Sequence, residues 1–253
     1  MIASLPMYDR ASTAEAYDRL WADIRDGLIA RGIPAPNTLN RTIRYRDTWA
    51  RDDLLLGQIC VMPLQQEFSD QIAVIGAADY AIDGCAPGFF KSLVICRADD
   101  GRTTLEGFAG RQFACNAKHS FTGSYAPMEL FAESGLQVKD PIITGSHDNS
   151  LRAVANGDAD FAAIDAHTFD LQQRDMAEAR LVKVFAETKS APGQSFITTK
   201  DRDPAPFFEA ISDAIAKLAP KDRATLGLRG IIDLPRATYD AAVPLRQPVP
   251  PTK

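Results

Sequence analysis

The stretch "TGSHDNSLRAVANGDADFAAID", Thr144 to Asp165, contains the signals that decide the fold. It joins the end of one strand to a helix that starts after "GS" and ends at Gly157, and then to a second strand that ends in Asp165. A strand, a short loop and a helix in this order are the building unit of an α/β sheet.

The same unit is predicted three times in a row. "RQFACN" (111–116) leads into "HSFTGSYAPMELF" (119–131), "DPIITG" (140–145) leads into the helix described above, and "ADFAAID" (159–165) leads into "HTFDLQQR" (167–174). This alternation predicts an α/β fold with a largely parallel sheet and helices on both faces.

The remaining segments extend the pattern on both sides. A capping box formed by Ser12 and Glu15 predicts a helix that ends at Gly32. Further strands are predicted over 1–6, 42–45, 53–59, 72–80, 91–97, 181–188 and 195–200, and further helices over 204–219 and 221–230. The proline-rich end, 244–253, is predicted to be loosely held.

Composition restricts the class of function. The chain has 253 residues, of which 45% are hydrophobic and 24% charged, and its formal net charge is -5. This length supports one large domain or two lobes, and the mild acidity argues against nucleic acid as the main partner. We find no apolar run of about 18 residues, so no membrane insertion is expected. The four cysteines have no C-x-x-C spacing and are interpreted as buried free thiols.

The beginning of the chain bears on its compartment. "MIASLPMYD" lacks the basic start and the small-residue cleavage site of an export segment, which predicts a cytoplasmic protein as encoded. The alternative is a periplasmic location, if an export segment has been removed.

The turn "HSFTGS" is a candidate anion site. In open α/β sheets, ligands bind beyond the carboxyl ends of the strands, where loops enter the helices. A helix that starts at this turn offers free backbone N–H groups and a partial positive charge. Ser120, Thr122 and Ser124 add hydroxyl donors, and Gly123 lets the backbone approach closely. An ordinary helix cap explains the same residues, so both interpretations stay open.

The whole chain resembles the solute-binding proteins of the phosphate, phosphite and phosphonate group, which serve ABC importers and have the type II periplasmic-binding-protein fold. Four stretches carry the resemblance: "SLPMYD" (4–9), "GCAPGFFKSLVICRADD" (84–100), "HSFTGSY" (119–125) and the stretch from Thr144 to Asp165. It implies capture of a small oxyanion such as a phosphonate or phosphate for ABC-type uptake, with an ABC transporter membrane component as partner. We predict no cofactor.

The resemblance also implies two lobes with a ligand cleft between them. Residues 1–98 and 189–253 would form one lobe and residues 99–188 the other, with crossovers near "ADDGRT" (98–103) and "TKSAPGQ" (188–194). Together with the turn hydroxyls, the positions that match the family's motifs give the candidate ligand-binding residues Tyr8, Ser120, Thr122, Gly123, Ser124, Ser146, His147 and Asp165.

Two departures from the family pattern keep other functions open. The chain shows no export segment, and Ser124 follows the turn glycine where close relatives tend to have a tyrosine. One alternative is a cytoplasmic enzyme on the same fold, similar to enzymes of thiamine-pyrimidine or menaquinone synthesis. The other is a ligand-responsive sensor module.

The three histidines raise the question of metal binding or catalysis. His119, His147 and His167 all fall in predicted strand-to-helix loops, where an imidazole could touch the ligand. Their spacing does not match the i, i+3 or i, i+4 pattern of metal sites, so we predict no metal site. Ser120, His147 and Asp165 include the residue types of a hydrolytic triad, but no G-x-S-x-G elbow is present, so we assign no catalytic residue.

Overall fold

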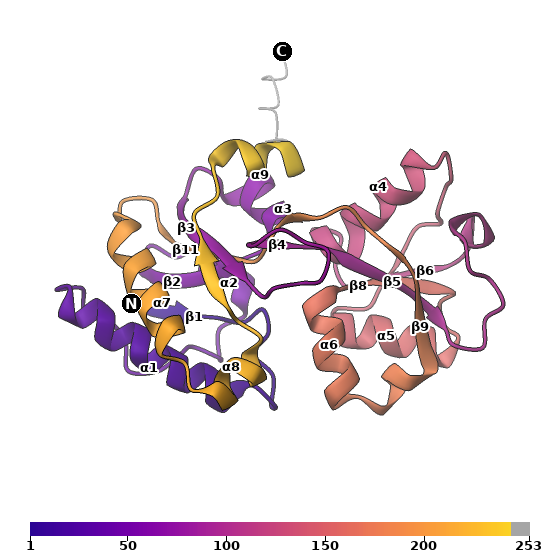
Figure 1. The fold of residues 1–253 in the computed structure, drawn as a ribbon. Coiled ribbons are helices and arrows are strands. Elements are labelled where there is room, and N and C mark those ends of the chain that lie inside the picture. Colours follow the sequence, from indigo (N-terminus) through magenta and orange to yellow (C-terminus); the bar gives the residue numbers. More distant parts are fainter. Residues whose placement is uncertain (244–253) are drawn as a thin grey trace, which may run out of the picture. The chain divides into compact units, whose positions relative to one another are not determined.

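The computed structural model describes residues 1–243, and this chain divides into two compact units (Figure 1). Within residues 1–243, unit 1 contains Met1–Ala81, Ala86–Phe89 and 192–243, and unit 2 contains Ile82–Cys85 and Phe90–Ala191. The predicted tail, 244–253, lies outside the described residues. Among the helices of residues 1–243, none is both long enough and apolar enough to cross a membrane.

Unit 1 is built on a five-stranded mixed sheet in the order β1-β2-β11-β3-β12. β1 and β2 run parallel, β11 runs antiparallel to β2 and β3, and β12 runs antiparallel to β3. The strands are β1 (Ile2–Ser4), β2 (Leu54–Ile59), β3 (Ile72–Asp79), β11 (Ser195–Thr199) and β12 (Gly230–Ile232). Every residue of β2 and β11 is buried, as expected for inner strands that are covered on both faces.

The two long helices of unit 1 pack against each other. They are α1 (Ala14–Ala30) and α7 (Ala205–Lys217). The apolar positions Tyr17, Leu20, Trp21, Ile24 and Leu28 of α1 are all buried, in agreement with the helical spacing of the sequence. The shorter helices are α2 (Tyr45–Trp49), α3 (Val61–Pro63), the π-helical turn η1 (Leu64–Phe68), α8 (Pro220–Leu226) and α9 (Arg236–Ala242).

Two local predictions for unit 1 are wrong. The helix α1 is not closed by a Ser12–Glu15 box: Thr13 is its N-cap, and the Thr13 hydroxyl donates to the Tyr8 carbonyl (2.7 Å) instead. The predicted strand 42–45 is a bend that enters α2. Its apolar residues were too few to distinguish a strand from a loop by spacing alone.

Unit 2 has a second five-stranded mixed sheet, in the order β7-β6-β8-β5-β9. β6 runs parallel to both β7 and β8, while β5 runs antiparallel to β8 and β9. The strands are β5 (Ser92–Arg97), β6 (Phe113–Cys115), β7 (Ile142–Ile143), β8 (Phe161–Asp165) and β9 (Val182–Glu187).

Helices follow three of these strands, which confirms the three predicted strand-loop-helix units. β6 leads into the π-helical turn η3 (Phe121–Tyr125) and α4 (Ala126–Glu133), β7 leads into α5 (His147–Asn156), and β8 leads into α6 (Ala166–Asp175). The 3-10 helices η2 (Leu105–Phe108) and η4 (Ala177–Leu181) complete the unit.

The core of unit 2 follows the alternation of its strands. Phe113, Cys115 and Phe161 belong to one buried cluster, which also contains Phe131 of α4. The residues that alternate with them along β6 and β8 belong to a second cluster, which contains Leu151 and Val154 of α5. Because successive strand residues point to opposite faces, α4 and α5 cover opposite faces of the sheet.

The division into units differs from the predicted lobe boundary at its first crossover. β5 pairs with β8 and β9, which places the strand in unit 2 instead of the lobe of residues 1–98. The chain passes between the units at residues 81–90 and 191–192, where β4 (Phe89–Phe90) and β10 (Ala191–Pro192) pair with each other. "ADDGRT" lies within unit 2.

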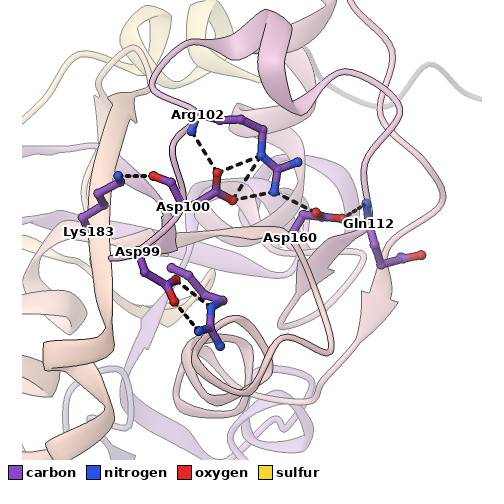
Figure 2. A network of polar contacts seen from close by, with 7 residues as sticks. Asp99, Asp100, Arg102, Gln112, Asp160 and Lys183 are labelled. Atoms are coloured by element: carbon purple, nitrogen blue, oxygen red, sulfur yellow. Dashed lines mark hydrogen bonds and ion pairs between the residues drawn. The ribbon is translucent and has the colours of Figure 1, made fainter.

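The "ADDGRT" turn carries a network of charged side chains instead of a crossover (Figure 2). Arg102 Nε donates to Asp100 Oδ1 (2.9 Å), and Arg102 Nη2 also donates to Asp160 Oδ1 (2.9 Å). Asp160 Oδ2 in turn accepts from the Gln112 backbone N–H (3.0 Å), and Lys183 Nζ donates to the Asp100 carbonyl. The network therefore links the residues before β6 and β8 to the end of β5 and to β9.

We expect Asp100→Asn to lower the free energy of unfolding by about 1 to 2 kcal/mol at neutral pH, because Arg102 loses a charged acceptor. Hydrogen bonds from Arg102 lower the pKa of Asp100 to about 2. This stabilisation is therefore present above the unfolded-state pKa, about 4, and is lost as the pH falls towards 2.

Urea unfolding of parent and variant between pH 7 and 2 measures this effect. Asp99→Asn is the control, because Asp99 pairs with Arg97 on the exposed surface and should contribute little. Equal acid sensitivity of the parent and Asp100→Asn would contradict the assignment.

Candidate functional site

The carboxyl ends of β6, β7 and β8 meet at one edge of the unit 2 sheet, because the three strands are parallel neighbours. The loops that leave this edge contain seven of the eight candidate residues. Ser120 is the N-cap of η3, Ser146 of α5 and Asp165 of α6. The eighth candidate, Tyr8, belongs to unit 1.

The turn that contains Ser120 is held by internal hydrogen bonds. Ser120 Oγ accepts from the Gly123 N–H (3.0 Å), and the Ser120 carbonyl accepts from the Tyr125 N–H (3.1 Å). The Gly123 N–H, which we expected to meet an anion, thus serves as part of the helix cap. The Ser120 hydroxyl accepts in this contact, so its own hydrogen can be donated to a ligand.

Thr122 connects the turn to the neighbouring loop. Thr122 Oγ1 lies 3.2 Å from His147 Nε2, at the start of α5. The Thr122 carbonyl accepts from Ser92 Oγ of β5 (2.9 Å), which fixes the turn on the sheet. The direction of this contact depends on the tautomer of His147. With hydrogen on Nε2 the ring donates to Thr122 and the Thr122 hydroxyl hydrogen is left for a ligand, whereas with hydrogen on Nδ1 the Thr122 hydroxyl donates to the ring.

His147 is uncharged at neutral pH. Burial of the ring lowers the pKa of His147 to about 4, and the nearby Asp148 carboxylate and Ala163 backbone offset this only in part. Its Nδ1 atom is buried and has no hydrogen-bond partner among the described residues. The imidazole therefore acts at this edge as a neutral hydrogen-bonding group.

Three other candidates serve the local structure. Ser124 Oγ donates to Met128 Sδ (3.9 Å), so its hydroxyl contacts the first turn of α4. Ser146 Oγ accepts from the Asn149 N–H (3.1 Å), and Asp165 Oδ1 accepts from the Thr168 N–H (2.9 Å), as expected of helix caps. These contacts give each residue a structural task.

Asn116 also lies at this edge and is not among the residues predicted from the sequence. It directly follows β6, and its Oδ1 atom is buried with no hydrogen-bond partner among the described residues. A Cβ atom on Gly123 would lie 1.8 Å from Asn116 Oδ1 and 3.2 Å from His147 Cε1. Asn116 could have been predicted from its position directly after a strand, because residues at the carboxyl ends of strands line the ligand sites of α/β sheets.

Tyr8 lies in an aromatic cluster of unit 1. It is 3% exposed, and its ring meets that of Tyr80 edge-on, with centroids 4.8 Å apart. The hydroxyl groups of Tyr80 and Tyr17 are 3.3 Å apart. The cluster forms near the carboxyl ends of β1 and β3, since Tyr8 follows β1 and Tyr80 follows β3.

The contacts of the polar side chains bear on the metal and hydrolase alternatives. Within residues 1–243, no group of three or more His, Cys, Asp or Glu side chains could hold a metal ion. Ser120 and Asp165 act as helix caps, and His147 contacts Thr122. None of these three contacts joins Ser120, His147 and Asp165 to one another.

A protein-family model described as "ABC transporter, phosphonate, periplasmic substrate-binding protein" matches residues 61–241. No curated protein matches the sequence.

Solved structures share the fold at low identity. They include XAC2383 from Xanthomonas citri bound to chloride ion (TM-score 0.71, 16% identity, 96% of this chain and 95% of that chain covered). PhnD1 from Prochlorococcus marinus in complex with methylphosphonate has a TM-score of 0.69 at 16% identity, with 95% and 94% covered. A binding protein component of an ABC phosphonate transporter from Pseudomonas aeruginosa has a TM-score of 0.64 at 16% identity, with 91% and 80% covered.

Proposed function

Because the chain belongs to the family of periplasmic substrate-binding proteins of phosphonate ABC transporters, we propose that it captures a small phosphonate-type oxyanion for uptake. We place the anion at the η3 turn of unit 2, against the hydroxyl groups of Ser120 and Thr122. The observation that carries this assignment is the Thr122–His147 contact of 3.2 Å, which orients a hydroxyl at the carboxyl edge of the sheet.

The chemistry of the turn suits an anion that is bound by hydrogen bonds. The Ser120 hydroxyl hydrogen and, in the tautomer of His147 with hydrogen on Nε2, the Thr122 hydroxyl hydrogen supply donors, and the cap geometry holds both residues in place before a ligand arrives. Donors that are already oriented bind an anion without a further ordering cost. Ser124, whose hydroxyl faces Met128, has no part in this proposal.

The proposal includes partner and compartment. The family description names a periplasmic component of an ABC transporter, so we propose a transporter membrane component as the partner. It also favours the periplasmic alternative over the cytoplasmic location expected from the start of the sequence.

We expect Thr122→Val to weaken binding of methylphosphonate about tenfold to hundredfold, measured by isothermal titration calorimetry. The substitution keeps the shape and removes one hydrogen bond to a charged ligand, which is worth about 1.5 to 3 kcal/mol.

Ser124→Ala is the matched control from the same turn, and we expect its affinity to stay within about twofold of the parent. If folded Thr122→Val protein binds as tightly as the parent, the turn is only a helix cap and the site lies elsewhere.

A further inference from the structure

The side chain of Asn116 brings a hydrogen-bond acceptor into the candidate site. The Asn116 backbone carbonyl accepts from the Gly145 N–H (3.1 Å), which holds the end of β6 to the loop after β7. With the backbone fixed in this way, Oδ1 is buried and accepts no hydrogen bond from the described residues. A buried acceptor atom normally accepts at least one hydrogen bond, so Asn116 Oδ1 requires a donor.

Asn116 Oδ1 lies directly beside Gly123. The place where a Gly123 Cβ would stand is 1.8 Å from Asn116 Oδ1 and 3.2 Å from His147 Cε1. Gly123 is itself bonded to Ser120, and His147 to Thr122. Asn116 Oδ1 therefore lies among the groups to which we assign the oxyanion.

The charge of this group of residues limits the ligand. Ser120, Thr122 and Asn116 are uncharged, and His147, with its pKa of about 4, is neutral at neutral pH. A doubly charged anion loses more hydration on binding than a singly charged one, and no cation of the group compensates for this loss. The four side chains together favour a single negative charge.

We propose that Asn116 recognises the proton of the oxyanion, so that the site prefers a singly protonated phosphonate to a sulfonate or a phosphonate dianion. This inference rests on the proposed function. A phosphonate monoanion has one P–O–H group, which donates to Asn116 Oδ1, and two further oxygens, which accept from Ser120 and Thr122. A sulfonate has the same shape and charge but no proton, so one of its oxygens would face the Asn116 oxygen.

The preference can be measured with two probes that differ in this proton. The affinities of methylphosphonate and methanesulfonate are determined by calorimetry below and above the second ionisation of methylphosphonate. We expect the parent to bind methanesulfonate at least about tenfold more weakly than the methylphosphonate monoanion. Affinity for methylphosphonate should fall by about tenfold per pH unit above its second ionisation, because the binding form disappears.

Methanesulfonate, which has no ionisable proton, distinguishes a titration of protein groups near the turn from a titration of the ligand. The ionisable groups in the loops of this edge are Lys118, His119, His147, Asp148, Asp165, His167 and Cys115, the last with a thiol pKa that burial raises. A titration of any of them would change the methanesulfonate affinity as well. A decline seen with methylphosphonate alone therefore belongs to the ligand.

Asn116→Ala tests the residue itself. We expect the ratio of the two affinities to fall to within about threefold, while Asn116→Asp, which keeps an acceptor, retains the dependence on the ligand proton. The proposal is overturned if the parent binds methylphosphonate with no pH dependence across the ionisation, a measurement that needs no variant. It is also overturned if Asn116→Ala keeps the parent's ratio. Binding of neither probe by the parent would contradict the proposed function as well.

Discussion

Gly123→Ala is expected to reduce methylphosphonate affinity by more than a hundredfold. The added Cβ would lie 1.8 Å from Asn116 Oδ1 and 2.8 Å from Asn116 Cγ, distances at which one of the two residues has to move. Movement of the turn would break the bond of the Gly123 N–H to Ser120 and take Thr122 away from His147, and movement of the Asn116 side chain would take Oδ1 away from the same groups. A misplacement of about 1 Å is enough to lose most of the binding energy of oriented hydrogen bonds.

The clash also predicts a loss of stability of about 1 to 3 kcal/mol for Gly123→Ala, measured by urea unfolding. The double variant Gly123→Ala, Asn116→Ala should recover most of this loss, because the second change removes the atoms that clash. Gly101→Ala is the control, since a Cβ there meets no atom within 4 Å. A loss that the double variant does not recover would contradict the assigned contact.

Phe161→Ala is expected to lower the free energy of unfolding by about 3 to 5 kcal/mol. The ring of Phe161 is fully buried in β8, with centroids 5.0 Å from Phe113, 5.1 Å from Phe131 and 5.7 Å from Phe108. It joins two strands, α4 and η2, so its removal leaves a cavity that these elements cannot all close.

Phe161→Leu is the matched variant and should lose only about 1 to 1.5 kcal/mol, because it keeps most of the apolar volume. Urea unfolding measures both losses. If the dependence of the free energy of unfolding on urea concentration is unchanged, the substitution has changed stability and not the unfolded state. If Phe161→Ala costs less than about 1 kcal/mol, the four rings do not form the core contact described here.

The parts of the fold that were predicted correctly depend on neighbours in sequence. The cap at Ser146 and the left-handed Gly157 are local signals, and they bound α5 as expected. The strand that ends in Asp165 was equally clear, because its apolar run is followed at once by a helix cap. The resemblance to the phosphonate-binding family was confirmed by the family model, which matches residues 61–241.

The parts that were missed depend on contacts between residues far apart in sequence. Asn116 became a candidate only when the fold placed it against Gly123 and His147. The first crossover was placed too late because the sequence of β5 does not show that its partners are β8 and β9. Ser12 had the residue type of a helix cap, but Thr13, whose hydroxyl donates to the Tyr8 carbonyl, occupies the cap position and the helix starts at Ala14.

The order of the strands in unit 1 has a consequence for protein synthesis. β11 lies between β2 and β3, yet it follows all of unit 2 in the chain. The ribosome therefore delivers β1, β2 and β3 without the strand that holds β2 to β3, while the five strands of unit 2 emerge as one nearly continuous segment. Unit 2 is thus complete in the nascent chain before unit 1 can close its sheet.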